Sequence, residues 1–301
     1  MDFSQAQTAI LNLLGRVSPG VLPKLMHWVK NSSDIEKLTP SNADVLLHGI
    51  ADDLRGFLPV EAMVGSENQA MENLHKLPKP TLHVDAFLYN DDTIDLLCDE
   101  GKMSRNYCLS CGSRKTAPID FLSHSFSIVE LKYLFQHVLP DLSEKTLVDV
   151  GSRLGAVLYA GYVYSSARQL KGVEINADLC NLQDNIIKKY QFTDRIQVYH
   201  SDICSQQSLL HHADVVVLNN VFEYFLDTEE QIRTWIFLRE NIMKKECLLV
   251  TVPSLKESLH KLQINLQLNQ WVEEIELDPD IFLGSETDRE SLSDIHLYRV
   301  L

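Results

Sequence analysis

From Asp141 onward, short apolar runs alternate with segments in which apolar residues recur at helical spacing. This alternation predicts strands joined by helices, the pattern of a parallel sheet covered by helices. The run Asp214–Leu218 is almost entirely valine and leucine, which is typical of a central strand buried on both faces. The five predicted parallel strands are Thr146–Val150, Leu170–Ile175, Ile196–Ser201, Asp214–Leu218 and Cys247–Val252.

Helices are expected between these strands. One covers Leu179–Tyr190, and another begins at Thr228, where Thr228 and Gln231 have the spacing of a capping box. Two later runs, Trp271–Leu277 and Asp294–Leu301, alternate between apolar and polar residues as an antiparallel pair does. The pattern therefore predicts an α/β fold whose parallel sheet is closed by a C-terminal antiparallel hairpin.

The chain before residue 125 has a different pattern. Apolar residues at helical spacing predict N-terminal helices over Phe3–Val17, Val21–Lys30, Ser41–Leu54 (with Ser41 as cap) and Val60–Leu77. The stretch Leu77–Pro80 holds two prolines and ends this region. We expect a helical extension over 1–80, a turn-rich segment with cysteines over 81–124, and a strand–helix domain over 125–301. The first helix of that domain should begin at a capping box formed by Ser127 and Glu130.

Composition narrows the class of protein. The 301 residues are 45% hydrophobic and 23% charged, as in a globular chain, and the net charge is −15. Such a charge disfavours a nucleic-acid surface, which needs clustered Lys and Arg, and it favours a basic protein partner, although it also simply aids solubility. The N-terminus lacks a signal-peptide pattern, and no apolar run reaches the roughly 20 residues that span a bilayer. Six cysteines in a chain of this length do not indicate a disulfide framework, so we expect an intracellular protein without a membrane.

The first candidate ligand-binding residues follow the first predicted parallel strand. Thr146–Val150 runs into the turn Gly151–Gly155, and the next strand ends at Glu174. Strand, glycine turn, helix, strand and acid form the pattern of a nucleotide-binding βαβ unit. The glycines allow a tight turn with close backbone approach. The helix start offers N–H groups to the polar end of a ligand, and Glu174 is placed to accept both hydroxyls of a ribose.

Five parallel strands closed by a late hairpin resemble the seven-strand, Rossmann-like fold of class I S-adenosylmethionine-dependent methyltransferases. The resemblance covers about residues 125–301 and implies S-adenosylmethionine as cofactor. It implies that Glu174 binds the ribose, that Asp202 accepts from the adenine amino group, and that Ile203 lies beside the adenine ring. The residues it assigns to the methionine end are Asp149, Gly151, Ser152, Arg153 and Gly155. Arg153 replaces a glycine that is frequent in the family; it could meet the cofactor's carboxylate, or it could obstruct the pocket of a non-catalytic relative.

The resemblance also locates the reaction. The segment after the fourth strand presents the methyl group in this family, and here it reads Asn219-Asn220-Val221-Phe222-Glu223-Tyr224. Asn219 and Asn220 offer amide carbonyls that could orient a nucleophile, and Asn219 is also expected to contact the cofactor. Glu223 could act as base or carboxylate anchor, and Tyr224 could form a wall of the pocket. The Asn-Asn pair is also similar to seven-strand histone-lysine methyltransferases, and with the acidic charge this weakly favours a protein side-chain nitrogen as acceptor. A small molecule or an RNA stays open, and the charge disfavours RNA.

The segment before the strand–helix domain contains a candidate metal site. Cys108 and Cys111 in Cys-x-x-Cys-Gly have the form of half a zinc knuckle. Zinc needs four ligands, and Cys98 and His124 are candidates for the other two, with His83 as an alternative to His124. A turn with two reduced thiols explains the same pattern. His124 could alternatively contact the cofactor or the substrate, or cap a helix.

The sequence therefore predicts a methyltransferase that uses S-adenosylmethionine. Two other classes stay open. One is a non-catalytic module that keeps the fold for binding. The other is a nicotinamide-dependent oxidoreductase, which the terminal hairpin and Arg153 disfavour, because a dinucleotide needs that glycine for close approach of its pyrophosphate.

Overall fold

The computed structural model describes residues 3–31, 33–59, 67, 72, 79–110, 114–281 and 289–301. The chain divides into two compact units, Met1–Leu46 and Leu47–Leu301. The N-terminal helices are α1 (Phe3–Leu14), α2 (Leu22–Asn31) and α3 (Ser33–Arg55). The predicted start of a helix at Ser41 is wrong, because Ser41 lies inside α3. The predicted helix Val60–Leu77 lies mostly outside the described residues.

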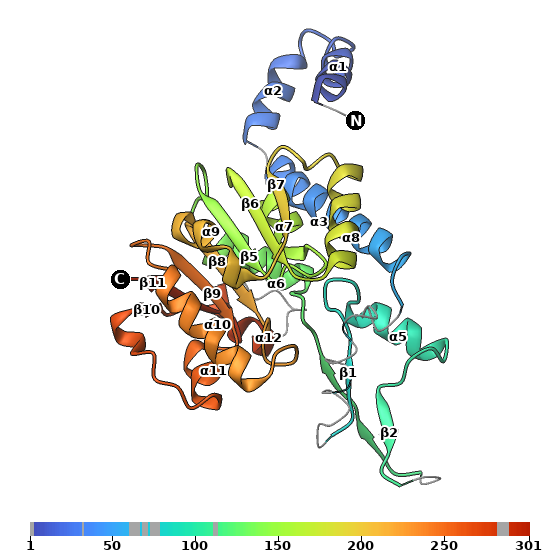
Figure 1. Cartoon of the computed structure of the whole chain (residues 1–301). Coiled ribbons are helices and arrows are strands. Elements are labelled where there is room, and N and C mark those ends of the chain that lie inside the picture. Colours follow the sequence, from blue (N-terminus) through green and yellow to red (C-terminus); the bar gives the residue numbers. More distant parts are fainter. Residues whose placement is uncertain are drawn as a thin grey trace. The chain divides into compact units, whose positions relative to one another are not determined.

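Seven strands form one sheet in the order β10-β11-β9-β8-β5-β6-β7 (Figure 1). The strands β5 to β9 are parallel, whereas β11 is antiparallel to both of its neighbours, β9 and β10. The strands are β5 (Thr146–Val150), β6 (Gln169–Glu174), β7 (Ile196–His200), β8 (Val215–Asn219), β9 (Leu248–Val252), β10 (Val272–Ile275) and β11 (His296–Val300). This sheet confirms the predicted fold class, the Rossmann-like seven-strand fold of class I methyltransferases with its C-terminal antiparallel pair.

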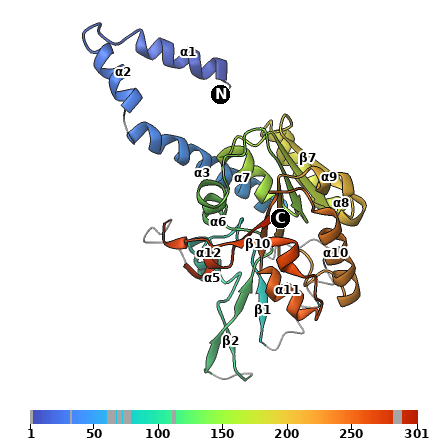
Figure 2. The same cartoon turned by 90° about the vertical axis from the view of Figure 1, so that its left-hand side faces the viewer.

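Helices cover both faces of this sheet. Figures 1 and 2 agree in placing α9, α10 and α11 on one face, with α6 and α7 on the other. The helices are α6 (Ile128–Tyr133), which continues as a π-helical turn over Leu134–Val138, α7 (Ala156–Tyr164), α8 (Ala177–Lys189), α9 (Gln207–His212), α10 (Thr228–Asn241), α11 (Leu255–Lys261) and α12 (Arg289–Ser293). Short 3-10 turns cover Ile203–Ser205, Leu268–Gln270 and Pro279–Ile281. None of the described helices is both long and apolar enough to cross a bilayer.

The main apolar core lies between the sheet and the helices α9 to α11. It combines alternate residues of the central strands, such as Val148 and Val216, with Trp235 and Leu238 of α10. Those side chains are buried, and burying a side chain of this size stabilises a fold by about 1.5–3 kcal/mol. The core therefore fixes the central strands, whose carboxyl ends carry the candidate site.

The chain between residues 81 and 122, which precedes the sheet in the sequence, forms four short strands and one helix. It belongs to the unit Leu47–Leu301. β1 (Thr81–His83) pairs in parallel with β4 (Asp120–Leu122), and β2 (Asn106–Cys108) pairs antiparallel with β3 (Thr116–Pro118). Helix α5 (Asp91–Asp99) lies between β1 and β2 in the sequence. The three-part division at residues 80 and 124 stays a prediction, and the compact units divide the described chain at Leu46 instead.

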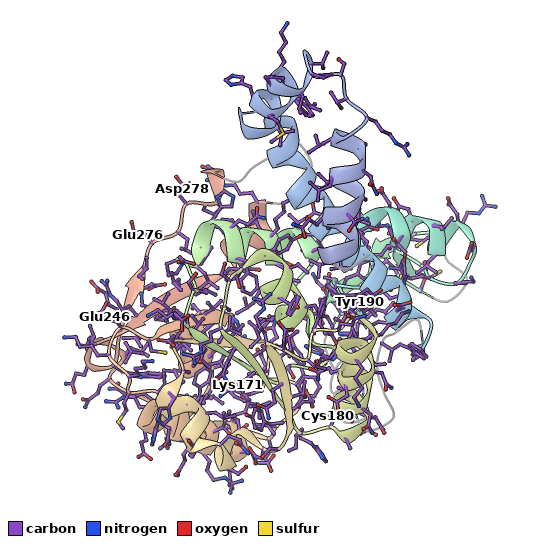
Figure 3. The ribbon with its side chains drawn as sticks, turned by 90° about the horizontal axis from the view of Figure 1, so that it is seen from above. Lys171, Cys180, Tyr190, Glu246, Glu276 and Asp278 are labelled. Carbon is purple, nitrogen blue, oxygen red and sulfur yellow. The ribbon has the colours of Figure 1, made fainter. Side chains whose placement is uncertain are left out.

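The end of α3 that belongs to the second unit contacts the sheet domain. Leu47, Ile50 and Leu54 are fully buried. The Tyr190 hydroxyl, at the C-terminal end of α8 (Figure 3), donates to Asp53 at 2.7 Å. The residues 47–55 are therefore part of the unit that holds the sheet.

Two capping boxes begin the helices next to the site. At α6 the Ser127 hydroxyl accepts from the Glu130 N–H, and the Glu130 carboxylate accepts from the Ser127 N–H, as predicted. At α10 the box is formed by Asp227 and Glu230, so the predicted pair of Thr228 and Gln231 is wrong by one position. Asp227 has the extended backbone that a cap requires, and Thr228 is already helical.

Replacing Ser127 by Ala should lower the free energy of unfolding by about 1 kcal/mol, because the first turn of α6 loses its side-chain acceptor. Urea denaturation measures this loss. Ser208→Ala is the control, an exposed serine inside α9 where alanine favours the helix. Equal midpoints for both variants would contradict the capping role.

Candidate active site

A cavity of about 860 Å³ opens at the carboxyl ends of β5, β6, β7 and β8. Its wall includes Gly151, Glu174, Asp202 and Asn219, one residue at or just after each of the four strands. Small-molecule sites in open α/β sheets lie at this edge, and their volumes run from roughly 300 to 1,000 Å³. The cavity therefore has the place and the size of a cofactor site.

The glycine turn after β5 is tight and folded against the neighbouring strand. Gly151 and Gly155 have φ of 69° and 85°, in the left-handed region that glycine adopts without a steric penalty. A Cβ at Gly151 would collide with Val221, and one at Gly155 would lie 2.7 Å from the Tyr159 ring. Both glycines are therefore required by backbone conformation and by close approach, as the sequence pattern predicted.

The turn's own N–H groups bond within the protein. Those of Gly151 and Ser152 both donate to the Val173 carbonyl, at 2.8 and 3.1 Å, and that of Arg153 donates to Glu174. A pyrophosphate needs free backbone N–H groups pointing at it. This turn therefore lacks the anion cradle of a dinucleotide site at Gly151, Ser152 and Arg153.

Arg153 occupies an unusual backbone position for a residue with a side chain. Its φ is 45°, and a left-handed conformation costs an L-residue about 1–2 kcal/mol. The same geometry explains why a glycine suits this position. Other interactions must therefore offset this conformational cost, and the Arg153 side chain makes them.

The Arg153 guanidinium is buried in an ion-pair network. It pairs with Glu67 at 3.0 Å through Nε and with Asp85 at 2.7 Å through Nη1, and all three side chains are at most 6% exposed. Asp85 is itself anchored, because it accepts from the Ser125 hydroxyl at 2.6 Å and from the N–H groups of Phe87 and Leu88. Arg153 lines the cavity, yet a large cavity remains beside it. Its guanidinium therefore does not fill the cavity.

The Glu174 carboxylate links the glycine turn to the end of β6. One carboxylate oxygen accepts from the Arg153 N–H at 2.9 Å and the other from the Asn176 N–H at 2.8 Å. Burial raises the pKa of Glu174, and these two backbone donors oppose that rise. A carboxylate has about four lone-pair sites, so Glu174 can still accept two hydroxyls of a ribose.

Asp149 lies within β5 beneath the turn and is almost fully buried. Burial raises the pKa of Asp149 to about 8, and the nearby Glu174 carboxylate adds to the rise. Asp149 does not line the large cavity, so its contact with a cofactor stays a prediction.

A residue that sequence reasoning missed holds the turn in place. Gln183 of α8 is fully buried; its Nε2 donates to the Arg153 carbonyl at 2.8 Å, and its Oε1 accepts from the Ser152 hydroxyl at 3.0 Å. Ser152 therefore supports the turn and does not line the cavity. The sequence does contain an indication of this role: Gln183 is a polar residue on the otherwise apolar face of α8 that includes Leu179, Ile186 and Ile187.

Asp202 and Ile203 both line the cavity beyond β7. Asp202 caps the 3-10 turn, where its Oδ1 accepts from the Cys204 N–H at 2.8 Å. Ile203 is buried in the wall of the cavity. The structure thus brings together Glu174, Asp202 and Ile203, the residues predicted for the adenosine part of the ligand.

The segment after β8 divides between two cavities. Asn219 and Asn220 line the large one, and Asn220 also lines the smaller one. The side-chain amide of Asn220 donates to the side-chain carbonyl of Asn219 at 3.2 Å. Glu223 lines a smaller cavity of about 210 Å³, where it pairs with Lys261 at 3.1 Å. Tyr224 contacts the His124 ring, with centroids 5.3 Å apart. The structure therefore places neither Glu223 nor Tyr224 in the wall of the large cavity, where Asn219 and Asn220 lie.

The candidate zinc ligands that the structure describes, Cys98, Cys108 and His124, do not form a metal site. No group of three or more His, Cys, Asp or Glu side chains in the described part of the chain could hold a metal ion. Cys108 is exposed at the end of β2, Cys98 is half-buried in α5, and Cys111 lies outside the described residues. His124 lies in the wall of the large cavity, so the predicted set of Cys98, Cys108, Cys111 and His124 finds no support.

No family model and no curated protein matches the sequence. Solved structures do match. An RNA methyltransferase from Salinibacter ruber in complex with S-adenosylhomocysteine is 16% identical, with 57% of this chain and 88% of that chain covered and a TM-score of 0.36. An O-methyltransferase from Bacillus cereus, also with S-adenosylhomocysteine, is 12% identical, with 60% and 84% covered and a TM-score of 0.41. At these values the neighbours add no argument about substrate or reaction, and the fold assignment rests on the sheet itself.

Arg153→Met should lower the free energy of unfolding by about 3–5 kcal/mol, because it leaves Glu67 and Asp85 buried without a counter-charge. Chemical denaturation measures the loss. The control, Arg168→Met, breaks an exposed pair with Glu144 and should cost at most about 1 kcal/mol. Adding Asp85→Asn to Arg153→Met should recover part of the loss. Equal costs for the two arginines would contradict the network.

Asp149→Asn should stabilise the protein increasingly as pH rises from 4 to 8. In that window folded Asp149 holds a proton that the unfolded chain has released, so this carboxyl lowers wild-type stability as pH rises through its folded pKa of about 8. The difference between variant and wild type should grow by up to about 1.4 kcal/mol per pH unit. Urea denaturation at pH 5, 6.5 and 8 measures it, and a difference independent of pH would contradict the shift.

Proposed function

We propose that this protein is an S-adenosylmethionine-dependent methyltransferase. The observation that carries the proposal is Glu174, a buried carboxylate at the end of the second parallel strand with acceptor capacity turned to a cavity of cofactor size. Glu174 would hold the ribose hydroxyls, Asp202 the adenine amino group, and the turn at Gly151 the methionine end. The cofactor supplies a methyl group that its positive sulfur already activates.

The charges around the cavity support a cationic ligand. Two guanidinium groups, Arg153 and Arg233, line it among the described residues, and Arg153 is already paired with carboxylates. The carboxylates that line it are Glu67, Glu174, Asp178, Asp202 and Glu230. An acidic wall stabilises a sulfonium and an ammonium and repels phosphates. With the bonded N–H groups of the glycine turn, this disfavours a nicotinamide dinucleotide.

The residues of the protein would accelerate the reaction by positioning the cofactor and the acceptor. Methyl transfer needs the nucleophile, methyl carbon and sulfur in line with water excluded, so positioning supplies most of the rate. Asn219 and Asn220 lie after β8, next to the glycine turn in the sheet order, where their amides would orient the acceptor. Glu223, paired with Lys261, would anchor the acceptor from the smaller cavity.

For the acceptor we propose a protein side-chain nitrogen. The net charge of −15 and the acidic cavity wall both disfavour a phosphate backbone near the site. A test incubates the enzyme and methyl-labelled cofactor with cell lysate fractions, and then treats the products with ribonuclease or protease. Label that only protease releases supports a protein acceptor, and label that ribonuclease releases overturns it.

Titration calorimetry tests the cofactor. S-adenosylhomocysteine should bind wild type, and NAD and NADP should not. Glu174→Gln should weaken binding by about tenfold to a hundredfold, because a charged acceptor for the ribose is worth roughly 1.5–3 kcal/mol. The control is Glu144→Gln, an exposed carboxylate paired with Arg168, which should leave affinity unchanged. No binding of S-adenosylhomocysteine at millimolar concentration would instead support a non-catalytic module.

A further inference from the structure

The N-terminal helices α1 and α2 present large apolar side chains to solvent. Each of these side chains is at least 37% exposed: Ile10, Leu11 and Leu13 in α1, and Met26, Trp28 and Val29 in α2. We call these six residues the N-terminal apolar face. A single exposed apolar residue is ordinary on a protein surface, but a concentration of them marks a surface that binds something.

The apolar and polar residues of α2 lie on different sides of the helix. Residues four positions apart are neighbours on a helix surface. Lys24 therefore adjoins Trp28 at one edge of the apolar side, and position 30, also a lysine, adjoins Met26 at the other edge. Helices that lie in the interface of a bilayer have this arrangement, with the aromatic ring at the border and the ammonium groups among the headgroups.

The charge of this stretch is opposite to that of the chain as a whole. Residues 3–31 contain Arg16, Lys24 and Lys30 and no Asp or Glu, although the chain has 42 acidic residues and a net charge of −15. The polar residues of α1 are serine, glutamine, threonine and asparagine, which are uncharged. The N-terminal apolar face is therefore accompanied by positive charge alone, which complements an anionic surface.

The breadth of the apolar face favours a bilayer over a groove in a protein. Leu11 and Leu13 are two positions apart, which places them about 160° apart around the helix, with Ile10 between them. All three side chains are exposed. A helix in a protein groove uses a narrower row of anchors at i, i+3, i+4 and i+7, whereas a helix half-immersed in a bilayer interface offers one whole side.

We propose that the N-terminal apolar face binds the surface of an anionic lipid bilayer, with α1 and α2 lying in the interface. Such helices lie on a bilayer and do not cross it, so they need not be long and apolar throughout. The proposal replaces the expectation of no membrane, which rested on the lack of a spanning segment in the sequence. It does not depend on methyl transfer, and a failure to bind S-adenosylhomocysteine leaves it standing.

Trp28 reports the contact directly. It is 45% exposed, whereas the other two tryptophans, Trp235 and Trp271, are 5% and 3% exposed. The difference in fluorescence between wild type and Trp28→Phe isolates its emission. Vesicles of phosphatidylcholine with about one-third phosphatidylserine should shift this emission to the blue, and bromine in the acyl chains should quench it. Binding to vesicles of phosphatidylcholine alone should be at least about tenfold weaker, because three basic residues lose their attraction.

Three results of this titration would overturn the proposal. The first is a Trp28 emission that is already that of a buried indole without vesicles, because the face would then be covered by protein. The second is equal binding to neutral and anionic vesicles, which removes the role of charge. The third is no response to either kind of vesicle, which leaves an acidic protein as the occupant of the face.

A matched pair of variants separates the apolar face from the polar side of the same helix. Ile10→Asp and Asn12→Asp add the same charge to α1 at exposed positions about 160° apart. Vesicle cosedimentation should show binding at least about tenfold weaker for Ile10→Asp than for Asn12→Asp, because the first variant also removes an apolar side chain from the interface. Both variants should melt as wild type does, since both positions are exposed. Equal losses of binding, or a lower melting temperature for Ile10→Asp alone, would contradict the proposal.

Discussion

The architecture of the site depends on one buried interaction, the guanidinium of Arg153 held between Glu67 and Asp85. A side chain in the left-handed backbone of the glycine turn is unfavourable by itself. The ion pairs stabilise that conformation and also draw the arginine away from the space where a ligand would lie. Because Glu67 and Asp85 precede the sheet in the sequence, the glycine turn is shaped by a segment outside the repeated strand–helix units. Gln183 supports the same turn from α8.

The conformation of the glycine turn also determines which class of ligand the cavity can bind. The turn's N–H groups donate to Val173 and Glu174, so they are not offered to phosphates. The charged side chains that face the cavity are mostly carboxylates, and Glu174 is held in place by two backbone donors and can still accept hydroxyls. A sugar attached to a cation satisfies both features. A dinucleotide also has ribose hydroxyls for Glu174, but its pyrophosphate would find neither free N–H groups nor an unpaired positive charge at the glycine turn.

The sequence predicted the sheet well because each buried strand is an apolar run that ends where the chain leaves the core. The same reasoning located Glu174, Asp202 and Asn219, since residues at the carboxyl ends of neighbouring parallel strands meet at one edge. It could not find Glu67 and Asp85, because their pairing with Arg153 spans 86 and 68 residues and leaves no local pattern. Nor could it give the direction of Glu223, which pairs with Lys261 in the adjacent cavity. The half zinc knuckle stays a prediction, because two cysteines do not specify where further ligands lie and Cys111 is outside the described residues.

The central claim is that the cavity beside Arg153 accommodates an adenosyl ligand while the arginine stays with its carboxylates. A crystal structure of the protein soaked with S-adenosylhomocysteine tests it most directly. The account predicts both ribose hydroxyls within hydrogen-bond distance of Glu174, with the guanidinium still on Glu67 and Asp85. An empty cavity, or a guanidinium turned into it, would contradict the account.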